Sequence, residues 1–181
     1  MTYTRLKMKS SVRGPVGKTV LIGEGGVGKT SLAVRYTEDR FDEKMKMTIG
    51  VNFASKKVKL EGKEVTLLIW DLGGQPRFQE VVSSYFVGAL LAIAVYEVPT
   101  PYTLYRLEDW IRRLHESVPD CPVFIVGNKT DERGDGSVTE SQAMEFAAKY
   151  GARHFFVSAK NGTGVEDMFN AAAALVAQRL R

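Results

Sequence analysis

The chain has 181 residues and a formal net charge of +4, and 44% of its residues are hydrophobic and 25% charged. This length predicts one compact domain with a sizeable core, and the composition excludes a disordered chain. The longest uninterrupted apolar run, residues 86–96, is too short to span a bilayer. We expect no secretory signal, because the basic N-terminus is not followed by an apolar run and a cleavage site. The single cysteine, Cys121, excludes a disulfide framework and a cysteine-built zinc site, so we expect a reducing, cytoplasmic location.

The excess positive charge is concentrated at the N-terminus. Residues 1–20 contain five basic residues and no acidic ones, so the rest of the chain is close to neutral. We therefore predict a basic arm over residues 1–17, followed by one domain over residues 18–181. Such an arm can contact nucleic acid or anionic lipid, or it is a solvated chain end or a short edge strand. We expect no specific nucleic-acid partner and only weak membrane contact through the arm.

After the arm, strand-like segments alternate with amphipathic helical segments. Strands are predicted over residues 19–22, 51–60, 64–70, 89–96, 123–126 and 155–157. Helices are predicted over residues 30–36, 104–115, 141–150 and 165–176, the third capped by Ser137 or Thr139. The pattern predicts an α/β fold with a mostly parallel, six-stranded sheet, one antiparallel edge strand and helices on both faces. Ligands of such sheets bind at the carboxyl ends of the strands.

A glycine-rich segment follows the first predicted strand. Residues 23–30 read GEGGVGKT and match the phosphate-binding pattern GxxxxGK(S/T). Backbone N–H groups and a helix N-terminus would face the phosphates, Lys29 would add a full charge, and Thr30 a hydroxyl ligand for Mg²⁺. The alternative is a glycine-rich turn with an incidental lysine, which the strand–loop–helix context disfavours. A second Gly-Lys-Thr at residues 17–19 is dismissed, because Val12 replaces the first glycine and the triplet precedes a strand.

Two segments in the second half of the chain favour guanine over adenine. Residues 128–131, Asn-Lys-Thr-Asp, follow one buried strand, and residues 158–160, Ser-Ala-Lys, follow the last strand. The Asp131 carboxylate can accept the paired N–H donors that guanine offers, and a backbone N–H of residues 158–160 can meet the guanine carbonyl. A loop Asn or Asp is often only a turn former. An ATP-hydrolysing protein would leave Asp131 without a role, however.

The chain resembles the Ras superfamily of small GTPases over residues 18–178, most closely its Rab-like branch. The matching stretches are GEGGVGKTSL, MTIGVNF, WDLGGQPRF, GNKTD and VSAKNGTGVEDMF. The resemblance implies the P-loop NTPase fold of small G-proteins, with Mg²⁺ as cofactor and GTP or GDP as ligand. It implies a molecular switch that slowly hydrolyses GTP to GDP and phosphate. Loops 41–50 and 72–84 would be ordered by GTP. We expect a monomer whose partners are effectors, exchange factors and GTPase-activating proteins.

The resemblance assigns roles residue by residue. Phosphate contacts fall to Gly25, Gly26, Val27, Gly28, Lys29, Thr30 and Ser31, and Mg²⁺ to Thr30, Thr48 and Asp71. Gly74 would contact the γ-phosphate, and Gln75 would orient the attacking water; Lys29 and Thr48 complete the catalytic set. The guanine site would consist of Phe41, Asn128, Lys129, Asp131, Ser158, Ala159 and Lys160.

Several residues depart from the Rab pattern. Met45 stands where G-protein α-subunits carry an arginine finger, so we expect slow turnover unless a partner supplies the charge. Residues 71–75, DLGGQ, are Arf-like, and Pro76 either presets or misplaces Gln75. The C-terminus offers no cysteine for prenylation, so either no lipid anchor is used or a tail is missing from this sequence. These mixed features favour a prokaryotic or archaeal source.

Rival functions remain open from the sequence. One is a guanine-nucleotide-binding module with negligible hydrolysis, and another is a membrane-trafficking component recruited by the basic arm. Phe53, Trp70 and Tyr85 resemble an effector-binding patch of Rab proteins, or they pack inside. Met45 and Met47 form either an adaptable partner surface or part of a mobile loop.

Overall fold

The structure is a computed structural model that describes residues 14–180, so most of the predicted basic arm lies outside the described part. The strands are β1 (Val16–Ile22), β2 (Val51–Leu60), β3 (Lys63–Leu72), β4 (Leu91–Glu97), β5 (Val123–Asn128) and β6 (Arg153–Phe156). The α-helices are α1 (Lys29–Glu38), α2 (Gln79–Phe86), α3 (Tyr102–Tyr105), α4 (Leu107–Ser117), α5 (Glu140–Ala148) and α6 (Val165–Arg179). Two short 3₁₀ helices are η1 (Pro76–Phe78) and η2 (Thr130–Glu132).

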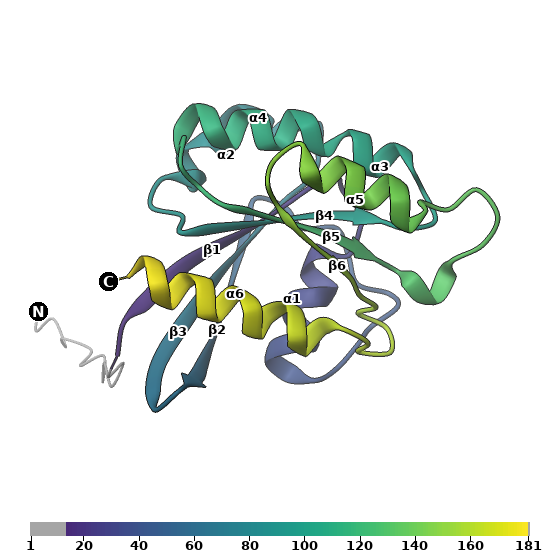
Figure 1. The fold of residues 1–181 in the computed structure, drawn as a ribbon. Helices are drawn as coiled ribbons and strands as arrows, with labels where there is room; N and C mark the ends of the chain where they lie inside the picture. Colours follow the sequence, from purple (N-terminus) through teal and green to yellow (C-terminus); the bar gives the residue numbers. More distant parts are fainter. Residues whose placement is uncertain (1–13, 181) are drawn as a thin grey trace, which may run out of the picture.

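The strands form one sheet in the order β2-β3-β1-β4-β5-β6. The β2–β3 hairpin is antiparallel, and every other neighbouring pair is parallel, which confirms the predicted sheet. Figure 1 shows α2, α3, α4 and α5 on one face of the sheet and α1 and α6 on the other. Parallel strands in this arrangement end at one edge, so the loops that follow β1, β3, β4, β5 and β6 gather there.

The central strands are buried from both sides, which explains their continuous apolar runs. Val20 and Ala92 point into the core beneath α4, whereas Leu21 and Ile93 point into the core beneath α1 and α6. The indole of Trp110 fills the first core and is 1% exposed. No helix within residues 14–180 combines the length and apolarity needed to cross a membrane.

Helix α2 is the element that the sequence patterns missed. Its segment QEVVSSYF contains two β-branched valines and two serines, residues that favour other conformations over helix. Val82 and Phe86, four residues apart, are nonetheless buried in the core on the α4 side. Tertiary packing therefore overrides the weak local preference. The predicted loop 72–84 is in fact partly helical.

Other boundaries shift by a few residues. Strand β1 begins at Val16, so Val16 and Gly17 of the predicted arm pair with β3. The predicted helix 104–115 is two helices, α3 and α4, with Arg106 between them. Of the two predicted caps of α5, Thr139 is the one used, and its side chain forms a reciprocal capping box with Gln142.

A polar contact lies inside the sheet near its β6 edge. The Tyr96 hydroxyl and His154 Nε2 are 2.9 Å apart, and the His154 ring also packs edge-on against Phe156. Burial, together with the positive charge of Arg133, lowers the pKa of His154 to about 4. The ring is therefore neutral at physiological pH, and in the tautomer protonated on Nδ1 its Nε2 accepts the hydrogen bond from Tyr96.

We predict an acid-sensitive stability that depends on His154. As the pH falls from 6.5 toward about 4, the unfolded chain takes up a proton on this residue that the folded chain refuses. The free energy of unfolding should therefore fall across this window, by about 1 to 3 kcal/mol from this residue. Urea denaturation at several pH values, on wild type and His154→Gln, measures the effect. Gln keeps a hydrogen-bond acceptor but cannot titrate, so an equal loss in both proteins would contradict the assignment.

Candidate nucleotide-binding site

A cavity of about 450 Å³ opens where the strands end. It contains most of the residues that the sequence singled out: Gly25, Gly26, Gly28, Lys29, Thr30, Ser31, Phe41, Thr48, Gly74, Asn128, Lys129, Asp131, Ala159 and Lys160. Val27, Asp71, Gln75 and Ser158 do not line it but border residues that do. The lining residues that sequence reasoning did not assign to the site are Asp42, Glu43, Met45, Lys46, Met47 and Glu132.

The glycine-rich loop (residues 23–30) connects β1 to α1. Gly23, Gly26 and Gly28 adopt positive φ angles of 136°, 82° and 97°, which favour glycine. A Cβ at Gly28 would collide with the amide of Asn128. No described side chain caps the N-terminus of α1, so its first N–H groups and its dipole are free for an anion.

Lys29 lies beneath this loop and is 5% exposed. Its Nζ donates to the carbonyl oxygens of Gly23 and Glu24, at 2.9 and 2.8 Å. Burial lowers the pKa of Lys29 to about 8, although the negative charges of Asp71 and Glu24 oppose this shift. At neutral pH the amine therefore carries a positive charge that its neighbours balance only in part. Such a charge is available to bind an anion.

Three hard oxygen groups meet beside Lys29. The Thr30 hydroxyl donates to Asp71 Oδ2 at 2.5 Å, and the Thr48 hydroxyl lies 2.6 Å from that of Thr30 and 3.2 Å from Asp71 Oδ2. The other carboxylate oxygen, Asp71 Oδ1, is buried without a hydrogen-bond partner among residues 14–180. Burial raises the pKa of Asp71, while the hydroxyl of Thr30 and the charge of Lys29 lower it. Two hydroxyls and an underused carboxylate form a donor set that fits Mg²⁺.

The loops after β5 and β6 are fastened to the glycine-rich loop. Asn128 is buried; its Nδ2 donates to the Val27 carbonyl, and its Oδ1 accepts from the Ala159 N–H, each at 3.0 Å. Lys129 Nζ donates to the Gly26 carbonyl at 2.8 Å and also pairs with Glu97. The Ala159 N–H, one of the predicted base contacts, is therefore engaged by Asn128 in this structure.

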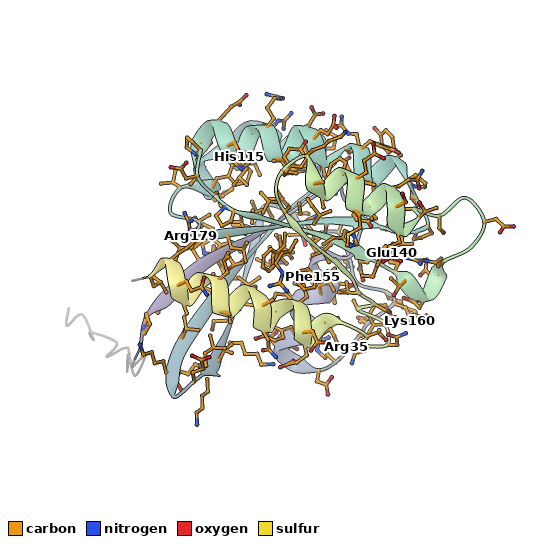
Figure 2. The ribbon with its side chains drawn as sticks, viewed as in Figure 1. Arg35, His115, Glu140, Phe155, Lys160 and Arg179 are labelled. Atoms are coloured by element: carbon orange, nitrogen blue, oxygen red, sulfur yellow. The ribbon has the colours of Figure 1, made fainter. Side chains whose placement is uncertain are left out.

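Asp131 is held where a base would enter. Its Oδ1 accepts a 2.5 Å hydrogen bond from the Ser158 hydroxyl, although the residue is otherwise exposed to the cavity side. Lys160 lines the cavity and pairs at 2.8 Å with Glu43, which also lines it. Figure 2 shows Lys160 near Arg35 of α1, whose guanidinium donates to the Ala159 and Lys160 carbonyls at 2.8 and 2.6 Å.

The segment after β3 closes the cavity from another side. A Cβ at Gly74 would overlap the backbone of Glu24 and Gly25, so only glycine allows this approach. Gln75 Nε2 lies 3.7 Å from the sulfur of Met47, which in turn lies over Gly25. Met47 thus occupies the space between the glycine-rich loop and Gln75.

The aromatic residues singled out from the sequence gather on one surface. Phe53 packs edge-on against Trp70 at 4.7 Å between ring centroids, and Tyr85 lies 6.2 Å from Trp70. Lys18 Nζ lies 3.5 Å from the centre of the Trp70 ring. Phe53 is 60% exposed, whereas Trp70 and Tyr85 are half-buried and pack against the core. Trp70 therefore packs partly against the core, and an effector-binding role of this patch stays a prediction.

This geometry defines a nucleotide-binding protein of the P-loop class. The chain matches the Ras family over residues 18–178. It is 38% identical to the Ras-related protein Rab-21 of Geodia cydonium over 153 residues, which are 84% of this chain and 67% of that protein. It is 35% identical to the Ras-related protein Rab-13 of Canis lupus familiaris over 157 residues, which are 86% of this chain and 77% of that protein. It is also 38% identical to the Ras-related protein Rab-21 of Mus musculus over 153 residues, which are 84% of this chain and 69% of that protein.

The chain belongs to the Ras family. It is a GTP-binding switch, a GTPase that hydrolyses GTP to GDP. The family and the Rab resemblance predicted from the sequence are confirmed, and the negligible-hydrolysis and membrane-recruited alternatives are not favoured. The Arf-like character of residues 71–75 and the prokaryotic or archaeal source stay predictions.

We predict that GDP affinity declines with pH because Lys29 loses its proton. Above about pH 8 the Lys29 amine of the free protein is mostly neutral. It must therefore take up a proton when the nucleotide phosphates bind. Affinity should fall about tenfold for each pH unit above that value. Fluorescence titration with a labelled GDP between about pH 7 and 9 measures it, with Lys29→Arg as the matched control. The guanidinium stays charged, so an equal pH slope in both proteins would contradict the assignment, whatever the absolute affinity of the variant.

Proposed function

We propose that the cavity binds GTP or GDP with Mg²⁺, and that water attacks the γ-phosphate in line with the leaving GDP. One observation carries the proposal: the glycine-rich loop, the Thr30–Thr48–Asp71 oxygen cluster and Asp131 all face one cavity or its wall. A phosphate chain has an anion site at one end of this cavity, and a base has a carboxylate at the other. A single guanine nucleotide accounts for both ends.

Base selection falls to Asp131. Its carboxylate would accept the ring N–H and the amino group of guanine, and the Ser158 hydroxyl fixes its orientation. Adenine offers no such pair of donors, so it would leave the carboxylate unpaired. Phe41, half-buried at the cavity wall, supplies an apolar surface for the base. Lys129 and Lys160 flank the same region, and Asn128 holds the loops in place.

The phosphates would be held by backbone and by Lys29. N–H groups of residues 25–31 surround the site, and Lys29 exchanges its loop carbonyls for phosphate oxygens. Thr30 and Thr48 would ligate Mg²⁺ directly, and Asp71 through water. When bound, Mg²⁺ neutralises charge that develops on the β- and γ-phosphate oxygens. The Gly74 N–H would hold the γ-phosphate from the opposite side.

Gln75 would orient the attacking water. Pro76 opens the 3₁₀ helix η1, a position that suits the fixed φ angle of proline, and so holds Gln75 just outside this helix. This placement favours a preset glutamine over a misplaced one. Met47 must move from its contact with Gln75 to admit water and the γ-phosphate. Loops 41–50 and 72–84 would therefore be the parts that respond to the nucleotide.

Partners would read and regulate this response. Met45 supplies no positive charge to the transition state, so the intrinsic rate is slow and an activating protein adds the missing cation. Exposed apolar residues beside the responding loops form a surface for effectors: Met47, Ile49, Phe53 and Val81. The protein acts as a monomer, and the predicted basic arm ends before Val16, because Val16 and Gly17 belong to β1.

We predict slow, Mg²⁺-dependent GTP cleavage that requires Gln75. Single-turnover assays with GTP and with ATP, on wild type and Gln75→Leu, measure it. The variant should bind GTP as tightly as wild type but cleave it at least about tenfold more slowly, because water loses its orienting group. ATP should not be cleaved. Wild-type cleavage as fast as a stimulated GTPase, or equal cleavage by the variant, would contradict the assignment.

A further inference from the structure

The glycine-rich loop contains an acidic residue, Glu24, which a phosphate site should disfavour. A carboxylate near phosphate oxygens repels them unless its charge is oriented away and compensated. In this structure the Glu24 side chain turns toward α4 and is largely buried, with 19% of its surface exposed. Its backbone faces the opposite way, toward Lys29 and Gly74.

Two residues at the start of α4 contact this carboxylate. The indole Nε1 of Trp110 donates to Glu24 Oε1 at 3.1 Å, and the guanidinium of Arg106 lies 3.5 Å from the same oxygen. Arg106 is itself fixed by Asp109, at 2.6 Å. Trp110 is buried in the core, so its indole is a rigid donor. These contacts join residues more than eighty positions apart in the chain.

The Glu24 backbone touches two parts of the proposed phosphate site. Its carbonyl oxygen accepts the 2.8 Å hydrogen bond from Lys29 Nζ, and its carbonyl carbon lies against Gly74. A shift of Glu24 would therefore displace the amine that binds the outer phosphates. It would also alter the wall that receives the γ-phosphate.

We propose that Glu24 is a positioning residue of the phosphate site, anchored by Trp110 and Arg106. The inference rests on the proposed function and extends it to residues outside the nucleotide cavity. The carboxylate holds the glycine-rich loop at the distance from α4 that sets the Lys29 amine. Trp110, whose indole bonds directly to the loop, also becomes an internal fluorescent reporter of its state.

The test compares Glu24→Ala and Glu24→Gln with wild type, all in a Trp70→Phe background, so that Trp110 is the only tryptophan of the chain. Release of labelled GDP is measured in excess unlabelled GDP, and Trp110 emission is recorded before and after GDP is removed. Glu24→Ala should release GDP at least about tenfold faster, because the loop loses its anchor. Glu24→Gln retains an oxygen acceptor for the indole and should restore most of the slow release.

Trp110 emission gives the readout that a purely structural role would not change. It should respond to GDP removal in the parent and in Glu24→Gln, and lose that response in Glu24→Ala. The matched control is Glu108→Ala, which removes an α4 carboxylate that pairs with Lys149, the residue that follows α5, away from the loop. This control should release GDP at the parent rate.

The outcomes separate the two proposals. A parent protein that binds no GDP overturns the proposed function and this inference together. A parent that binds GDP, with a Glu24→Ala variant that releases it at the parent rate, overturns only the positioning role. Faster release in Glu24→Ala and Glu108→Ala alike would also overturn it, because the effect would then reflect general loosening of α4.

Discussion

The close approach of the glycine-rich loop to its neighbours is the constraint on which the site depends. Side chains at Gly23, Gly28 or Gly74 would overlap the carbonyl of Val95, the amide of Asn128 or the loop backbone. The absence of these side chains lets three segments converge until backbone groups face one another directly. The converging segments enclose the cavity at the strand ends, beside the uncapped N-terminus of α1. Every other feature of the site uses this geometry.

Hydrogen bonds connect the part of the cavity that suits phosphates to the part that suits a base. Asn128 joins the carbonyl of Val27 to the N–H of Ala159, and Lys129 bonds to Gly26. Arg35, on the helix that begins at the glycine-rich loop, reaches the carbonyls of residues 159 and 160. Motif residues thus spend much of their hydrogen-bonding capacity on one another. A base bound at one end would thereby touch loops that are hydrogen-bonded to the glycine-rich loop.

Local patterns in the sequence predicted the sheet, the glycine-rich loop and the two segments 128–131 and 158–160, whereas the family resemblance placed Phe41, Thr48 and Gly74 in the site. They did not predict α2, whose segment has weak helix propensity and depends on the burial of Val82 and Phe86. They also left out Asp42, Glu43 and Lys46, which reach the cavity because of the path of the loop after α1. The hydrogen bond between Asn128 and the Ala159 N–H could not be predicted from the sequence either. Partners separated by 31 residues are set by tertiary packing rather than by local pattern.

The oxygen cluster explains how chemistry at the cavity would become a change of surface. Thr48 belongs to the cluster through its hydroxyl, yet its chain neighbours Met47 and Ile49 are exposed. A ligand that replaced the hydrogen bonds among Thr30, Thr48 and Asp71 with its own coordination would fix Thr48, and with it the exposed residues on either side. Loss of the γ-phosphate removes only part of that coordination. The two nucleotide states would then differ mainly in the conformation of the exposed loop around Thr48. That loop is the surface that a partner can reach.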